Sequence, residues 1–258
     1  MNRLIVHADD VGLAHSVNRA TFEALASGGV TSASIMVPCL AFEEAADYAR
    51  SHPDADLGLH LTLTCEVVAH KWGPVAPRER VSSLVDRHGF FWPRAEDVIG
   101  RATLADVIVE LRAQIETALR AGVQPTHFDS HMFVLCRTPG FRDALDALAR
   151  EYGVSAINPF RPPRPVNDRL TPVVTLVSAI DHAQPSGICE ELASKTRSPL
   201  NTCIVHCGFD DDELRGLFAP GPYDAAWRQR DYDAVSCPGF RAAIEGAGLV
   251  LTNWRAGV

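Results

Sequence analysis

Two adjacent carboxylates, Asp9 and Asp10, stand directly after a short apolar run near the start of the chain. The run Leu4-Ile5-Val6 is continuous rather than alternating, which is typical of a strand covered on both faces. In α/β proteins with such strands, functional sites lie at the carboxyl ends of the strands. Like charges side by side are unfavourable unless a cation or a proton compensates them. The pair is therefore a candidate metal or acid–base site, although Asp-Asp is also common in turns.

Histidines provide the second group of candidates. Those on or at the ends of predicted strands are His60, His127, His131 and His206. Period-two alternation places His127, Asp129 and His131 on one face of a strand. A single buried histidine usually has only a packing role. Three ionisable groups on one inward face favour function, because buried charges normally pair or bind metal.

The position of each candidate residue along its strand distinguishes possible metal ligands from residues that would hold those ligands in place. His131 lies about 13 Å beyond His127 at the rise of a strand, and so nearer its carboxyl end. Asp10 also follows its strand, and we expect it to hold a metal together with His131 and His60. One carboxylate and two imidazoles leave positions open for water and substrate, as in catalytic sites. His127 and Asp129 would lie lower, supporting the ligands or contacting substrate.

Alternating strands and helices must position these side chains. Beyond the opening run, strands are predicted at residues 30–37, 57–64, 126–134, 154–158, 173–177, 201–206 and 249–252. Helices are predicted at residues 16–27, 41–51, 104–119, 139–152, 190–197 and 237–247. This alternation predicts an α/β fold with mostly parallel strands, in one domain spanning residues 1–258. Ser16 is the predicted N-cap of the first helix.

Two segments lack clear periodicity. Residues 65–101 are rich in Pro, Gly and Trp, and we interpret them as a loop or lid over the site, with a surface excursion as the alternative. Residues 159–172 are rich in proline and contain Arg161, which could reach substrate or remain solvated.

Composition excludes several classes of partner. The 258 residues carry a net charge of −8, which argues against nucleic acid or an anionic membrane as a partner. No apolar stretch reaches membrane length, and the first is too short for a secretory signal. The seven cysteines are scattered without a Cys-x-x-Cys pair, so we expect a reduced, cytoplasmic protein.

Taken together, the motifs resemble those of the YdjC-like carbohydrate deacetylases, which include chitooligosaccharide deacetylases and a hopanoid-associated branch. The matching segments are HADDVGL (7–13), GVTSASIMV (29–37), GLHL (58–61), THFDSH (126–131), VHCGFD (205–210) and RDYDAV (230–235). They occur in the family's order and cover nearly the whole chain.

The resemblance implies an irregular, TIM-like (β/α) barrel and removal of an N-acetyl group from a small carbohydrate. It implies one divalent ion held by Asp10, His60 and His131, with Asp9 as general base and His206 as acid for the leaving amine. Two imidazoles suit zinc-like metals, whereas relatives are often described with magnesium, so both ions stay open. Whether the chain forms a homodimer is also open.

Two positions depart from the family pattern. Relatives often carry histidine where Phe133 and Leu135 stand, and a proline where Cys207 stands. On a continuing strand, Phe133 and Leu135 would share the face of His131 and give the site an apolar rim. We therefore expect poor activity on chitin-type disaccharides and a substrate with an apolar portion.

Two other classes of function remain as alternatives. A magnesium-dependent phosphoryl-transfer enzyme could also use an Asp-Asp pair after its first strand, but histidines are poor magnesium ligands and no glycine-rich phosphate loop is present. A catalytically inactive or regulatory carbohydrate-binding protein would be consistent with the replaced histidines.

Overall fold

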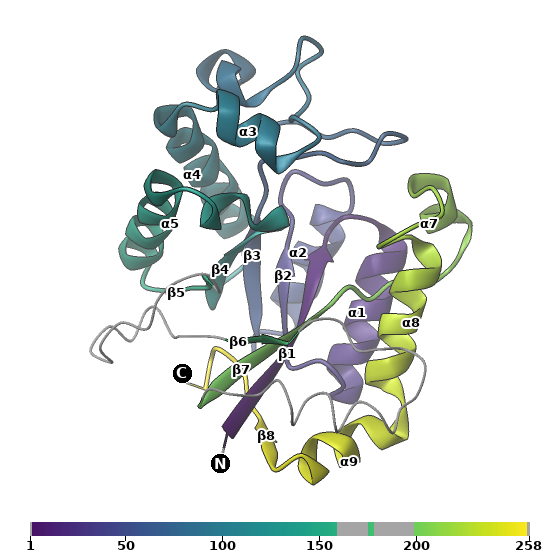
Figure 1. Ribbon diagram of the computed structural model, residues 1–258. Helices are drawn as coiled ribbons and strands as arrows, with labels where there is room; N and C mark the ends of the chain where they lie inside the picture. Colours follow the sequence, from purple (N-terminus) through teal and green to yellow (C-terminus); the bar gives the residue numbers. More distant parts are fainter. Residues whose placement is uncertain (1, 159–174, 178–198, 257–258) are drawn as a thin grey trace.

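The strands form one parallel sheet with β1 at its centre (Figure 1). The computed structural model describes residues 2–158, 175–177 and 199–256. The sheet order is β5-β4-β3-β2-β1-β7-β6, and β8 also pairs with β1. The strands are β1 (Asn2–Val11), β2 (Ser32–Ile35), β3 (Leu57–Leu61), β4 (His127–Ser130), β5 (Ser155–Ala156), β6 (Thr175–Val177), β7 (Leu200–Val205) and β8 (Leu249–Leu251). In the described part of the chain β5 and β6 do not pair, and the (β/α) barrel is irregular, as predicted.

Helices cover the sheet on its outer faces. They are α1 (His15–Ser27), α2 (Phe42–Ser51), α3 (Ala95–Arg101), α4 (Leu104–Arg120), α5 (Pro139–Tyr152), α7 (Asp212–Leu217), α8 (Ala225–Ser236) and α9 (Pro238–Gly246). In Figure 1, α4 and α5 flank β3 to β5, whereas α1 and α8 lie against each other on the opposite flank. Within the described residues, no helix is long and apolar enough to cross a membrane.

The core follows from the sequence pattern. Leu4, Ile5 and Val6 are fully buried, because helices and neighbouring chain cover both faces of β1. In α4 the side chains at helical spacing that face inward are Val107, Leu111, Ile115 and Ala118, all fully buried. The Thr103 hydroxyl accepts the amide hydrogen of Asp106 and caps this helix.

Several elements differ from the sequence-based expectations. Helices α7 and α8 were not predicted. The expected cap at Ser16 is wrong, because α1 begins one residue earlier and the Ser16 hydroxyl donates to Asp211 and Glu213 instead. The helix expected at residues 190–197 lies outside the described residues, as does Arg161.

Residues 65–101 contain more structure than a loop. They include α3 and the short 3₁₀ turns η1 (Arg78–Arg80) and η2 (Ser82–Leu84). This segment, here called the excursion, lies beyond the carboxyl ends of β3 and β4 (Figure 1). The buried Glu110 carboxylate anchors it to α4 by accepting the amide hydrogens of Val75 and Ala76.

The strand predicted at residues 126–134 is shorter than expected. β4 ends at Ser130, and His131–Cys136 forms a 3₁₀ turn, η3. Met132 and Phe133 both have a φ of 52°, in the left-handed region that breaks a strand. Leu135 is fully buried in the core. The expectation that Phe133 and Leu135 continue the line of His131 to an apolar rim is therefore wrong.

Candidate metal and catalytic site

A backbone irregularity lets both adjacent aspartates face the site. In a regular strand, neighbouring side chains point to opposite faces. Here the β1–β2 register shifts between Ala8 and Val11, and Asp10 has a φ of 70°. Such a bulge redirects a side chain, and Asp tolerates the left-handed region better than most residues. Asp9 Oδ2 and Asp10 Oδ1 consequently lie 3.8 and 3.4 Å from the same atom, His60 Nε2.

Asp10, His60 and His131 form one compact cluster at the carboxyl ends of β1, β3 and β4. One potential ligand atom from each lies within 4.8 Å of the others, and all three residues are buried. Asp10 Oδ1 is 3.4 Å from His60 Nε2 and 3.4 Å from His131 Nδ1, yet it makes no hydrogen bond. A buried carboxylate oxygen without a donor, facing two imidazole nitrogens, is a chemically suitable set for a divalent ion.

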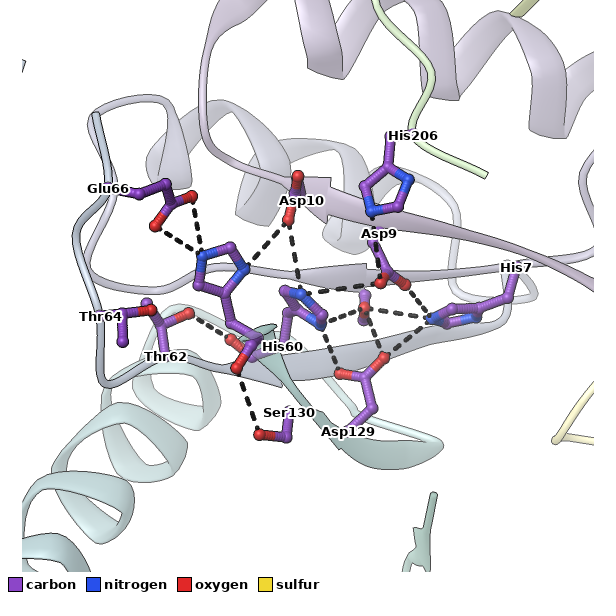
Figure 2. A network of polar contacts seen from close by, with 12 residues as sticks. His7, Asp9, Asp10, His60, Thr62, Thr64, Glu66, Asp129, Ser130 and His206 are labelled. Carbon is purple, nitrogen blue, oxygen red and sulfur yellow. Dashed lines mark hydrogen bonds and ion pairs between the residues drawn. The ribbon is translucent and has the colours of Figure 1, made fainter. Parts of the chain in front are cut away.

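Asp129 supports His60 from below (Figure 2). Its Oδ1 accepts a 2.8 Å hydrogen bond from His60 Nδ1, which leaves Nε2 directed at Asp10. Its Oδ2 accepts hydrogen bonds from His7 Nε2 at 3.0 Å and from the Ser34 hydroxyl at 2.9 Å. These contacts hold the pKa of Asp129 below its usual range, although burial opposes them. Asp129 therefore lies next to His60, and its supporting role stays a prediction.

His127 lies further from the cluster than Asp129 does. Its ring packs against the backbone of Gly58, where a Cβ atom would come within 2.3 Å of His127 Nε2, and edge-on to His7 at 5.0 Å. The glycine of the GLHL segment is thus required by close packing. Burial and the neighbouring His7 lower the pKa of His127 to about 4, so the ring is neutral.

Asp9 lies between two histidines (Figure 2). Its Oδ1 is 3.3 Å from His7 Nε2, and its Oδ2 is 3.9 Å from His206 Nε2. Burial alone would lower the pKa of His7, but its hydrogen bond to Asp129 and the negative charge of Asp9 raise it to about 10. A positively charged His7 therefore fixes the Asp9 carboxylate from one side, and His206 faces it from the other.

His206 is held by an acidic residue of α8. Asp231 Oδ2 accepts the backbone amide hydrogen of His206 at 2.7 Å and lies 3.9 Å from His206 Nδ1. Burial raises the pKa of Asp231 to about 6, and burial lowers the pKa of His206 from its usual value.

Sequence reasoning missed two charged residues of the site. Arg228 of α8 donates from Nη2 to Asp10 Oδ2 at 2.8 Å, and Glu66 of the excursion accepts from His131 Nε2 at 3.0 Å. Arg228 stands two residues before the RDYDAV segment (230–235), and its closeness to this family motif was the one sequence feature that could have indicated a role in the site. Glu66 stands in a stretch without periodicity, where the sequence offers no signal.

The fold and the cluster define an irregular (β/α) barrel with an Asp-His-His centre at the carboxyl ends of its strands. The family model described as "YdjC-like protein" matches residues 3–246. The chain therefore belongs to the YdjC-like family.

Individual relatives agree with this assignment. A carbohydrate deacetylase of Enterococcus faecalis (strain ATCC 700802 / V583) is 36% identical, with 98% of this chain and 97% of the relative covered. A carbohydrate deacetylase of Geobacillus stearothermophilus is 38% identical over 62% of this chain, and the match spans only 61% of the relative's length. The crystal structure of a putative cellobiose-phosphate cleavage protein from Enterococcus faecalis V583 superposes with a TM-score of 0.84 at 28% identity, covering 99% of each chain.

Proposed function

We propose that this protein is a metal-dependent carbohydrate deacetylase that removes an N-acetyl group from an amino sugar. One observation carries the proposal: the buried Asp10 Oδ1 has no hydrogen-bond donor and faces a nitrogen of each of His60 and His131. The names of the curated relatives, carbohydrate deacetylases, supply the substrate class.

Asp10, His60 and His131 would hold the ion. When bound, a divalent ion in such a site lowers the pKa of a water molecule and polarises the acetyl carbonyl. Two imidazoles favour zinc or another transition metal over magnesium, which selects oxygen ligands. The seven cysteines are scattered through the sequence without a Cys-x-x-Cys pair, which supports a cytoplasmic location.

Asp9 is the proposed general base. Its buried Oδ1 accepts no hydrogen bond, and His7 holds the carboxylate at the edge of the cluster. In hydrolysis, Asp9 takes the proton of the attacking water as the new C–O bond forms. Its position beside the ligand set, rather than within the Asp10–His60–His131 cluster, fits this role.

His206 is the proposed general acid. It faces Asp9 across 3.9 Å, and Asp231 fixes its backbone. As the C–N bond breaks, His206 supplies a proton to the departing nitrogen, so that acetate and a free amine leave. The lowered pKa of this imidazole makes its protonated form a stronger acid.

The test is release of acetate from N-acetylated substrates. Purified protein is stripped with a chelator, reconstituted with zinc or magnesium, and offered N-acetylated chitooligosaccharides and other acetylated amino-sugar conjugates. We expect acetate release that is lost on stripping and restored by one of the ions. Turnover that is indifferent to chelation, or no acetate from any conjugate with the reconstituted protein, would contradict the proposal.

A further inference from the structure

In each of the two histidines of the cluster, the ring nitrogen that faces away from Asp10 contacts a second carboxylate. His60 directs Nε2 at Asp10 and donates from Nδ1 to Asp129. His131 is reversed: Nδ1 lies 3.4 Å from Asp10 Oδ1, and Nε2 lies 3.0 and 3.1 Å from the two oxygens of Glu66. Each ring therefore lies between Asp10 and a second carboxylate.

The two supporting carboxylates come from different parts of the fold. Asp129 belongs to β4, inside the sheet, and only 9% of its side chain is exposed. Glu66 belongs to the excursion, and 32% of its side chain is exposed. Glu66 is therefore at the solvent edge of the cluster.

Hydrogen bonds of the two residues that precede Glu66 hold the chain in place there. The Cys65 amide donates to the carbonyl of Trp92 at 3.0 Å, and the indole of Trp72 donates to the carbonyl of Thr64 at 2.8 Å. Trp72 is itself buried. The position of Glu66 thus depends on Trp72 and Trp92 of the excursion.

We propose that Glu66 is a positioning residue that selects the tautomer and orientation of His131. A neutral imidazole that donates from Nε2 keeps the lone pair on Nδ1, the nitrogen that faces Asp10. A carboxylate on the outer nitrogen of a metal-binding histidine also makes the ring a stronger ligand. The inference rests on the metal site of the proposed function and adds that the excursion is part of that site.

Metal affinity tests the proposal without any acetylated substrate. Zinc affinity is measured by competition with a chromophoric chelator for the parent protein, Glu66→Ala, Glu66→Gln and the control Glu79→Ala. Glu79 is an exposed residue of the same excursion. Loss of an outer-shell partner typically weakens affinity about 10–100-fold, which we expect for Glu66→Ala. Glu66→Gln retains one acceptor oxygen and should recover part of the loss, whereas Glu79→Ala should match the parent.

A spectroscopic readout separates positioning from a purely structural role. In the zinc-loaded parent, ¹⁵N shifts of His131 should show a protonated Nε2 and an unprotonated Nδ1. Glu66→Ala should give mixed tautomers, with a thermal midpoint of the metal-free form close to that of Glu66→Gln. Unchanged affinity and tautomer in both Glu66 variants would overturn the proposal. A parent that binds no metal would overturn it together with the site, whereas a parent that binds zinc but releases no acetate would contradict only the deacetylase assignment.

Discussion

Arg228 Nη2 and Asp10 Oδ2 are joined by a 2.8 Å hydrogen bond between two buried side chains. The two oxygens of the Asp10 carboxylate therefore have different neighbours: Oδ2 accepts from Arg228, whereas Oδ1 faces the two histidines. Burial would raise the pKa of Asp10, but the guanidinium and His131 hold it well below its usual range. Arg228 thereby keeps Asp10 ionised and oriented by a contact from α8, more than two hundred residues away in the chain.

The Arg228–Asp10 pair should be strongly coupled in stability. Arg228→Met leaves a buried carboxylate without its cation, and breaking such a pair costs about 3–5 kcal/mol. In an Asp10→Asn background the same change should cost less, because no charge is left unpaired. Urea unfolding of the four metal-free proteins measures this coupling. Equal costs in the two backgrounds would mean that the pair is not coupled.

Asp9→Asn should lower turnover while the protein keeps its metal. The amide has nearly the shape of the carboxylate but cannot accept the water's proton, and general-base catalysis contributes about 10²–10⁴-fold. The rate of acetate release at saturating substrate is the measurement. Turnover close to that of the parent would remove Asp9 from the mechanism.

His7 should make the stability of the metal-free protein depend on pH. Its pKa in the folded state, about 10, exceeds the ordinary value of 6.5. The stabilisation is therefore complete below pH 6.5 and is lost as pH rises through about 10. The free energy of unfolding of the parent should approach that of His7→Gln over this window, by up to about 1.4 kcal/mol per pH unit.

The control for His7 is His70→Gln, because His70 is exposed. Its unfolding free energy should run parallel to that of the parent from pH 6.5 to 10. A constant difference between the parent and His7→Gln across the window would show that His7 is not charged in the folded protein.

Local pattern predicted much of the fold. The apolar run of β1, the helical spacing in α4 and the alternation of strands and helices indicated a parallel α/β architecture, which the family match and the structure confirm. Strand ends also indicated that Asp10, His60 and His131 would meet, and they do lie together; their role as ligands stays a prediction. These inferences succeeded because burial and backbone period act over a few residues.

Features that depend on contacts between residues far apart in the sequence could not be predicted from the local sequence pattern. The left-handed backbone at Asp10 requires the bulge against β2, and the turn after Ser130 ends a strand that alternation alone would extend. Glu66 and Arg228 reach the cluster only through tertiary packing of the excursion and α8. Arg161 lies outside the described residues, so its approach to substrate stays an expectation.

The central claim is that Asp10, and not its neighbour Asp9, belongs to a metal site with His60 and His131. Bound zinc per chain, measured after reconstitution and desalting of the parent, Asp10→Asn and Asp9→Asn, tests this claim most directly. The two substitutions are adjacent and isosteric, so they differ chiefly in position. We expect about one ion per chain in the parent and in Asp9→Asn, and loss of the ion in Asp10→Asn. An ion retained by Asp10→Asn, or lost from Asp9→Asn instead, would contradict the account.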